Sequence, residues 1–575
     1  MRGDDALDGC APVGRRALLR AAVSGGLAAA LGGAACAPRD ARAVRRIQGA
    51  IVDRENVSGH LLRDRASLGA AAAGSTAGAT ASPGRSATAR VLIVGGGAAG
   101  LSVAWRLARA GVEGVVLLEL ADELGGTSRG GHLAGLAHPW GAHYLPVPRA
   151  EQRALSALLV DAGLARMPAS LAGRLEVDET LLVRAPDERL FTLGVWEDGL
   201  WPRGGGSSGD LDDAQRRRFL ALVDELAATP PDARGRRAFD LPLAHTSTAQ
   251  RGLDGESAKA FAARLGLDGP RMQWWLEYAT RDDFGASLED TSAYALVHYF
   301  TGRQAVAADG AATTGEYMTW PEGNARLIAE LQRLSVSGGL EVHRGQLAHR
   351  VANDGAAARV EAVDVATFER VSWRAEHVVL ATPQFVNLRT LAEDPARDAR
   401  ATFRYGPWVV ANLDLPAPPP EFGFPRCWDN VRYGSASLGY VDATHQLDRA
   451  ERGAVWTWYL PVTDRDERAA RAALLAAPWE HWRDLVLADL RGPHPDLAER
   501  VRRIDVRRFG HAMVRPSPGW LWSGARERAA EAIGRVHFAH TDLSGMALFE
   551  EAHWQGTRAA EEVLTALGVE SEPLA

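Results

Sequence analysis

The most regular hydrophobic pattern in the chain lies between residues 91 and 118. Val91–Val94 is a run of four aliphatic residues, which is typical of a strand buried on both faces of a parallel sheet. Residues 101–110 place apolar side chains on one face of a helix, and Gly111 is expected to end that helix. Val115–Leu118 repeats the aliphatic run. The pattern therefore predicts a strand, a helix and a second parallel strand.

Three glycines, Gly95, Gly97 and Gly100, separate the first predicted strand from the helix in the order G-x-G-x-x-G. Gly95 allows a tight turn, Gly97 lets the backbone approach a pyrophosphate, and Gly100 lets the helix pack closely on the strand. This spacing, directly after a strand and before a helix, is typical of dinucleotide-binding proteins.

The start of the helix and the end of the second strand add two further requirements of a dinucleotide site. Ala98 and Ala99 lie at the helix N-terminus, where free amides and the positive end of the helix dipole attract phosphate. Glu119 stands 19 positions after Gly100, near the spacing expected of an acid that binds the ribose. Strand, glycines, helix, strand and acid together favour a dinucleotide site over a glycine-rich structural turn.

A second glycine pair, Gly125 and Gly126, follows Glu119 and precedes Thr127 and Arg129. At these residues the sequence resembles the flavin-containing amine oxidase superfamily, which includes amine oxidases, protoporphyrinogen oxidase and carotenoid desaturases. The resemblance implies FAD as the cofactor, with the glycine pair, Thr127 and Arg129 near its phosphates. In the family an arginine follows the glycines directly, whereas here two residues intervene. A dehydrogenase that uses only NAD is disfavoured.

The resemblance continues through separated motifs to residue 568. Trp320–Asn324 resembles the turn that starts the second FAD-binding segment, and Leu347 matches the position that lays a backbone edge against adenine. Val378–Pro383 resembles the strand that leaves the FAD domain. His540–Gly545 resembles the C-terminal FAD motif, with Asp542 at the acidic position that meets the ribityl or pyrophosphate part. His540 replaces a glycine of the family, and both a place near the cofactor and a turn role remain open.

These motifs predict an α/β fold with a Rossmann-type FAD-binding domain built from discontinuous segments, and an α+β substrate domain. The FAD-binding segments are expected at 89–145, 315–385 and 530–568. The substrate domain would comprise 146–314 and 386–529, with surface loops at 204–213 and 229–237.

The first 38 residues read as an export signal rather than as part of the fold. Arg15 and Arg16 form a twin-arginine pair ahead of an uncharged Ala, Gly and Leu stretch, which is too short and weakly apolar for a membrane span. We therefore expect the twin-arginine export machinery as a partner and a periplasmic or extracytoplasmic location. Cys36 lies in a partial lipoprotein-processing context, so a lipid anchor there is a further hypothesis. Residues 39–88 are expected to form an arm that packs on the body and then a flexible linker.

Catalytic residues are harder to place, because the flavin performs the hydride chemistry and the protein positions the substrate. Many relatives hold a lysine near the flavin, and the order of motifs would place it within Trp408–Asn412, which contains none. We predict His143, His445 and His511 as catalytic candidates from their positions. Trp140–Tyr144, which includes His143, is expected to turn toward the flavin.

Composition narrows the function further. The 575 residues carry a net charge of -7, which argues against nucleic acid as a partner. The three cysteines are far apart without metal-ligand spacing, so no metal site is predicted. The leading hypothesis is an exported FAD-dependent oxidoreductase that oxidises a small amine or a related C–N or C–H bond. A desaturase or isomerase acting on an apolar substrate, and a flavin-binding redox partner without turnover, remain alternatives.

Overall fold

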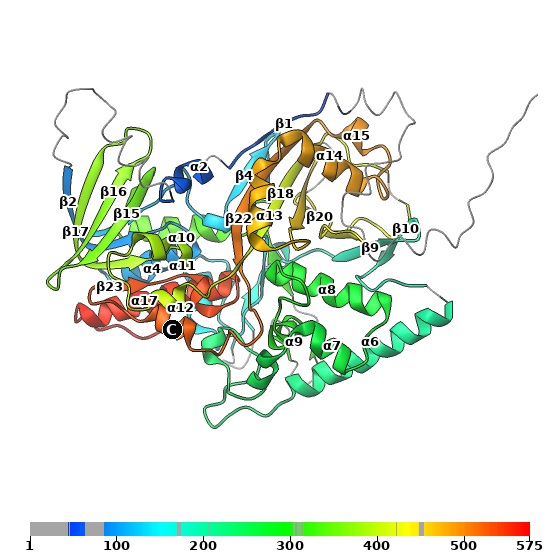
Figure 1. Ribbon diagram of the computed structural model, residues 1–575, viewed down its shortest axis with the longest axis horizontal. Helices are drawn as coiled ribbons and strands as arrows, with labels where there is room; N and C mark the ends of the chain where they lie inside the picture. Colours follow the sequence, from blue (N-terminus) through cyan, green and yellow to red (C-terminus); the bar gives the residue numbers. More distant parts are fainter. Residues whose placement is uncertain are drawn as a thin grey trace, which may run out of the picture. The chain divides into compact units, whose positions relative to one another are not determined.

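The structure is a computed structural model, and Figure 1 shows its ribbon. It describes residues 44, 46–53, 55–63, 85–169, 174–204, 206–302, 305–306, 312–313, 316–420, 422–447 and 453–575. The predicted signal segment and Cys36 lie outside the described residues. Residues 47–575 form one compact unit. None of the helices in the described ranges is long and apolar enough to cross a membrane.

A parallel sheet forms the centre of the dinucleotide-binding lobe. Its strands are, in spatial order, β14 (Glu341–His343), β3 (Val115–Leu118), β2 (Arg85–Val94), β17 (Arg370–Leu380) and β23 (Val536–Phe538). The last four residues of β2 and all of β3 are buried, as their aliphatic runs predict. Strands far apart in the sequence therefore meet in one sheet, which agrees with a domain assembled from discontinuous segments.

Two features of this lobe shift the predicted boundaries. β2 begins at Arg85, inside the range predicted as linker, because its first residues pair with β17. On the other side, β17 extends into an antiparallel sheet with β16 (Ala358–Asp364) and β15 (Gln346–Asn353). The short helix α11 (Gln384–Thr390) packs against β15, so the dinucleotide-binding lobe continues beyond residue 385.

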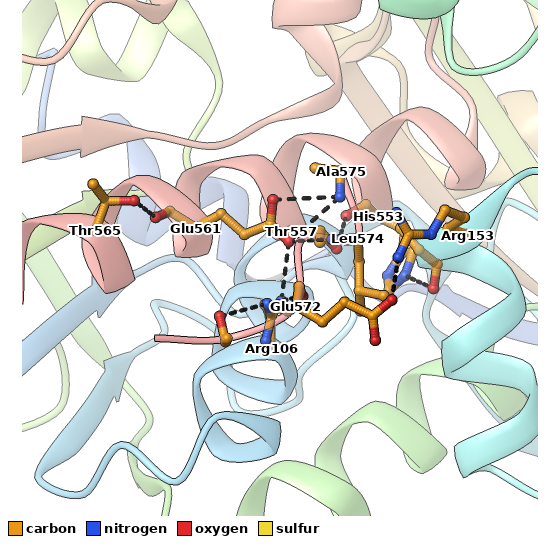
Figure 2. A network of polar contacts seen from close by, with 11 residues as sticks. Arg106, Arg153, His553, Thr557, Glu561, Thr565, Glu572, Leu574 and Ala575 are labelled. Carbon is orange, nitrogen blue, oxygen red and sulfur yellow. Dashed lines mark hydrogen bonds and ion pairs between the residues drawn. The ribbon is translucent and has the colours of Figure 1, made fainter. Parts of the chain in front are cut away.

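Three helices cover one face of the parallel sheet: α4 (Ala98–Arg109), α10 (Ala325–Ser337) and α17 (Phe549–Ala566). Alternate strand residues such as Val91 and Ile93 pack against them. Figure 2 shows how the C-terminal residues are tied to α17 and α4. Buried Arg106 of α4 donates to Glu561 of α17 and to the carbonyl oxygen of Glu572. The C-terminal segment therefore fastens the two helices that follow the first and last strands of the sheet.

An eight-stranded mixed sheet forms the second lobe. Its strands are, in spatial order, β1 (Gln48–Ile51), β22 (Arg503–Val514), β18 (Tyr405–Leu415), β21 (Ala454–Pro461), β20 (Tyr440–Asp442), β19 (Asp429–Arg432), β9 (Glu188–Thr192) and β10 (Val195–Asp198). Every residue of β18 is buried, because apolar clusters cover both faces of the sheet there. β1 belongs to the segment predicted as an arm, and it extends the edge of this sheet.

Helices complete the second lobe: α6 (Gly206–Ala227), α7 (Ala258–Arg264), α8 (Pro270–Phe284) and α9 (Ala293–Thr301). The predicted loop at 204–213 is wrong, because α6 begins at Gly206. Buried Asp212 of α6 forms an ion pair with Arg271 of α8 at 3.2 Å. A tertiary contact thus stabilises as helix a segment whose glycines and serines favour a loop.

Candidate functional site

The glycines before α4 have different neighbours. Gly95 has a φ angle of +107°, which favours glycine. A Cβ atom at Gly100 would overlap the carbonyl oxygen of Gly95, so a side chain there would push the helix away from the turn. At Gly97, among the described residues, a Cβ atom would meet only the Cα atom of Gly126, at 4.0 Å. Gly97 therefore faces open space.

The N-terminus of α4 lies at this open space. Gly97 is the N-cap residue and provides no side-chain hydrogen bond, and the first turn of α4 contains no acidic residue. Ala98 and Ala99 are buried. The first amides of a helix have no acceptor within the helix and carry the positive end of its dipole. The turn therefore presents amides suited to bind phosphate.

Glu119 lies beside the same turn, directly after β3. Its Oε2 atom accepts a hydrogen bond from the Gly96 amide at 2.6 Å, and Oε1 accepts one from the Ala121 amide at 2.8 Å. These bonds fix the carboxylate next to the glycines. Each carboxylate oxygen has two lone pairs, so Glu119 can still accept hydrogen bonds from ribose hydroxyls.

The second glycine pair lies against the first. The Gly125 amide donates to the Gly96 carbonyl at 2.8 Å, and Gly97 and Gly125 form a parallel bridge. A Cβ atom at Gly126 would approach the Cα atom of Gly97 at 3.5 Å. Gly97 and Gly126 thus border a space free of side chains, which we call the glycine cradle. A pyrophosphate fits the chemistry of this cradle, because the helix amides point to it and no described side chain lies within 4 Å of the Cβ positions of Gly97 and Gly126.

Thr127 and Arg129 continue from the cradle. Thr127 is exposed, and its carbonyl oxygen accepts a hydrogen bond from the Ala142 amide. Nε of Arg129 donates to the Gly126 carbonyl oxygen at 3.0 Å. Burial lowers the pKa of Arg129, which Glu119 partly offsets. Arg129 thereby brings a positive charge next to the cradle, and its contact with a phosphate stays a prediction.

Leu347 lies beside the ribose-binding position. It is buried in β15, and the amide of the preceding residue, Gln346, donates to the Glu119 carbonyl oxygen at 2.8 Å. The β15 backbone therefore runs next to Glu119, where the family resemblance would place adenine.

Asp542 forms hydrogen bonds with other residues of the protein. Its Oδ2 atom accepts hydrogen bonds from the Tyr405 hydroxyl at 2.6 Å and the Gln384 amide at 2.9 Å, and Oδ1 lies 3.0 Å from Nδ1 of His540. Burial acts to raise the pKa of Asp542, but the His540 charge and these hydrogen bonds hold it below its usual value. His540 also caps η6 (Thr541–Ser544). The structure thus gives both residues a role in holding this turn, and a contact of Asp542 with FAD stays a prediction.

His143 lies in an aromatic cluster. Its ring stacks on Tyr459 with centroids 5.1 Å apart, and the rings of Trp428 and Tyr144 lie at 5.2 and 5.3 Å. The hydroxyl of Tyr459 donates to the carbonyl oxygen of Gly141, two residues before His143. Trp140–Tyr144 therefore meets the strands β19 and β21 of the second lobe.

His511 and His445 have other neighbours. His511 stacks on Phe385 at 4.1 Å, and Tyr405, which bonds Asp542, lies at 5.6 Å. Burial and the Arg471 charge lower the pKa of His511 to about 4, so its imidazole is neutral at pH 7. His445 follows β20, and its Nε2 atom lies 2.8 Å from the Arg184 carbonyl oxygen. The three predicted histidines thus occupy three separate surroundings, and their catalytic roles stay predictions.

The segment that would carry the lysine in relatives holds Asn412 instead. Nδ2 of Asn412 donates to the Pro139 carbonyl oxygen at 3.1 Å, and its Oδ1 accepts from the Thr457 hydroxyl at 2.7 Å. Asn412 therefore joins β18 to the segment that leads into Trp140–Tyr144.

An acid–tyrosine cluster lies on the same lobe, and its members come from β9, from α8 and α9, and from β19, three parts of the chain that are far apart in the sequence. Glu188 of β9 pairs directly with Asp429 of β19 in the parallel register. The Tyr278 hydroxyl donates to Asp429 at 3.4 Å, and the Tyr299 hydroxyl donates to Asp282 at 3.5 Å. Carboxylates on neighbouring strands repel each other, so this arrangement costs stability unless protons or a cation compensate.

The pKa values of these acids are raised, as expected for carboxylates that repel each other. Burial and the charge of Asp187 raise the pKa of Glu188 to about 7. Burial, Asp282 and Glu188 raise the pKa of Asp429 well above its usual value. Yet Glu188 is exposed and Asp429 is only partly buried.

Comparison with known proteins identifies the first lobe. A family model described as an NAD(P)-binding Rossmann-like domain matches residues 93–162. This range includes α4, β3 and both glycine segments. A search of curated proteins gave no match. The first lobe is therefore a Rossmann-type dinucleotide-binding domain, which confirms the prediction from the glycine spacing.

Solved structures share the whole arrangement. Putrescine oxidase bound to putrescine is similar to this chain with a TM-score of 0.60 at 16% identity, covering 84% of this chain and 100% of the other. Cyclohexylamine oxidase from Brevibacterium oxydans gives 0.59, with the same identity and coverage. A fatty acid isomerase from P. acnes gives 0.54 at 16% identity, covering 83% and 98%. The likeness confirms the predicted fold class, a Rossmann-type domain with an additional sheet domain as in flavin amine oxidases.

Proposed function

We propose that the protein is an FAD-dependent oxidoreductase that oxidises a positively charged amine. The observation that carries the proposal is the glycine cradle at the N-terminus of α4, because it supplies free amides and space for a pyrophosphate. The fold, shared with two amine oxidases, favours FAD and amine oxidation over other uses of a dinucleotide.

One lobe would bind the cofactor, and the other would bind the substrate. Gly97, Ala98 and Gly126 would hold the pyrophosphate, and Glu119 would bind the ribose. When bound, FAD would accept a hydride from the carbon next to the substrate nitrogen. The second lobe would bind and orient the substrate. The aromatic cluster around His143 supplies flat apolar surfaces, which suit the carbon chain or ring of an amine.

The acid–tyrosine cluster supports a cationic substrate. Glu188 and Asp429 lie on adjacent strands, and a bound ammonium group would relieve their repulsion. An ammonium must also lose a proton before a hydride can leave its neighbouring carbon. A carboxylate whose pKa lies near 7, such as Glu188, can accept that proton at neutral pH.

The first test is cofactor content followed by anaerobic mixing with substrates. We expect a yellow protein with one FAD per chain, whose absorbance bleaches with a diamine or monoamine. A colourless protein that binds NAD and not FAD would refute the cofactor assignment. Bleaching by no amine in a broad panel would refute the substrate assignment while leaving the cofactor assignment intact.

A desaturase or isomerase of an apolar substrate is the second candidate. It is favoured by the lack of a lysine within Trp408–Asn412 and by the likeness to the fatty acid isomerase. Conversion of an unsaturated fatty acid without any response to amines would support it. FAD that no small donor reduces would instead support a flavin-binding redox partner.

We also propose export through the twin-arginine route, because Arg15 and Arg16 precede an uncharged apolar stretch. Replacing both by lysine keeps the charge but removes the recognised pair. We expect the double variant to accumulate as precursor in the cytoplasm. Normal export would instead indicate the general secretory route. Labelling with a lipid precursor, with Cys36→Ala as the control, tests the anchor hypothesis.

A further inference from the structure

Residues 47–53 and 55–63, which we call the arm, begin on the edge of the second lobe. Within the arm, β1 pairs in parallel with β22. The pairing is extended at both ends, since the Gln48 amide donates to the Arg502 carbonyl and the Val52 amide donates to the Val506 carbonyl. A Cβ atom at Gly49 would overlap the carbonyl oxygen of Ile504, so the arm lies as close to β22 as the backbone allows.

An ion pair fixes the arm just after β1. Asp53 is only 4% exposed, and its Oδ2 atom accepts from Nε of Arg508 on β22 at 2.8 Å. Oδ1 accepts from Nη2 of the same guanidinium at 3.2 Å, so the contact is bidentate. A buried, bidentate pair holds its two segments in one geometry.

From Asp53 the arm continues to the dinucleotide-binding lobe. Helix α2 (Glu55–His60) follows, and a Cβ atom at Gly59 would lie 3.6 Å from the Leu120 side chain, an ordinary van der Waals distance. Leu120 stands between Glu119 and Ala121, whose amide bonds the Glu119 carboxylate. Leu62, two residues after α2, is buried as well. The described part of the arm thus reaches Leu120, beside the ribose-binding position.

We propose that the arm is a clasp that retains the cofactor by joining the second lobe to the adenosine end of the FAD site. The chain enters the dinucleotide-binding lobe at β2, and before it does so α2 lies against Leu120, the residue next to Glu119. The inference rests on the proposed FAD site. Docking of the arm and binding of FAD then strengthen each other by the same factor, as linkage requires.

The test weakens the clasp without touching the cradle. In Asp53→Asn the charge of the buried pair is lost while the side-chain volume is kept. The control is Asp212→Asn, which breaks the Asp212–Arg271 pair of similar burial between α6 and α8. The rate of FAD release from each holoprotein is followed by the rise in flavin fluorescence after dilution. We expect release to accelerate at least about 10-fold in Asp53→Asn and to change less than about 2-fold in Asp212→Asn.

A second measurement tests whether bound FAD in turn stabilises the docked arm. Hydrogen exchange of the 47–63 amides is compared between holoprotein and protein stripped of FAD. We expect these amides to lose protection on removal of FAD, while the amides of β18 keep theirs. Equal rates of FAD release from the two variants would overturn the proposal. So would hydrogen-exchange protection of the arm amides that is the same with and without FAD. A protein that holds FAD but oxidises no amine would refute the proposed substrate and leave this test valid.

Discussion

Gly97, the N-cap of α4, and Gly100, in its first turn, exclude side chains for different reasons. Gly100 is required by the folded chain, because a Cβ atom there would overlap the Gly95 carbonyl. Gly97 has no such neighbour, and its Cβ position opens into the cradle. Substitutions at Gly97 and Gly100 can therefore separate an effect on cofactor binding from an effect on folding.

We predict that Gly97→Val folds with an unchanged unfolding temperature of the apoprotein but retains no FAD, because its side chain would fill the pyrophosphate position. Gly100→Ala is the comparison. It should lower the unfolding temperature of the apoprotein in addition to reducing the FAD content. Calorimetry and the flavin absorbance per chain measure the two effects. A Gly97→Val protein that is fully yellow would exclude the cradle as the cofactor site.

Asp429 offers a residue-scale test of substrate charge. In Asp429→Asn one carboxylate of the cluster is removed and its size is kept. We expect KM for a cationic amine to rise roughly 10–100-fold, the equivalent of one lost charge-assisted hydrogen bond of about 1.5–3 kcal/mol. FAD content should not change, because the other lobe holds the cofactor. A KM that stays the same would remove Asp429 from substrate binding.

The local arrangement of the glycine turn could be predicted from sequence, while the meeting of Glu188 and Asp429 could not. Gly95, Gly97, Gly100 and Glu119 belong to one continuous segment, so their spacing alone predicts the turn and the acid beside it, and their contact with a phosphate stays a prediction. Glu188 and Asp429 become neighbours only because β9 pairs with β19. The local sequence around each acid does not indicate that pairing, and an acidic residue seen alone in a sequence usually lies on a solvated surface.

At the scale of elements, the crossing of α17 over α4 determines where the phosphate-binding helix lies. A Cβ atom at Gly556 of α17 would overlap the carbonyl oxygen of Ala99 and approach the Cβ of Ser102 at 2.7 Å. The two helices therefore touch backbone to backbone beside the cradle. The last helix of the chain thus positions the first turn of α4.

We predict that Gly556→Ala lowers the free energy of unfolding by about 1–3 kcal/mol, the usual cost of overpacking. It should also weaken FAD binding, because α4 must shift to make room. Gly252→Ala serves as the control, since no described atom lies within 4 Å of its Cβ position. Denaturant unfolding and FAD titration of both variants measure the two effects. Equal stability of the two variants would contradict the predicted overlap.

Elements with a strong apolar period were predicted well, and those stabilised by tertiary contacts were not. The aliphatic runs of β2 and β3 and the helix between them lie where the pattern places them. The start of α6 was missed because its glycines and serines favour a loop, while the contact of Asp212 with Arg271 stabilises the helix. The first residues of β2 were missed because their composition is that of a linker and only pairing with β17 makes them a strand.

For the whole molecule, histidines with lowered pKa values determine the response to acid. Desolvation lowers the pKa from 6.5 to about 4 at the buried His138, His377 and His553 and at the exposed His511, and to about 3 at His494. Between pH 6.5 and 4 the unfolded chain therefore binds protons that the folded protein does not. Stability falls as the pH falls through this range.

Three acids act in the opposite direction. Desolvation raises the pKa of Glu188 and Glu551 to about 7 and that of Asp429 well above its usual value, so the folded protein holds protons there that the unfolded chain releases. Five histidines outnumber these three acids, and we expect a lower unfolding temperature at pH 5 than at pH 7. Unfolding at pH 5.5 should take up protons, measurable by calorimetry in buffers of different ionisation enthalpy. Release of protons would contradict this balance.

The assembly of the parallel sheet from distant segments has a consequence for the timing of synthesis. The strand before the glycine turn pairs with β17, which in turn pairs with β23, and α17 packs on α4. A growing chain lacks β23 and α17 until translation is almost complete, which at 5–20 residues per second means about half a minute or more. Contacts of such long sequence separation also form slowly. The glycine segment near the start of the fold is therefore synthesised well before its partners, and we expect the proposed FAD site to form only in the finished chain.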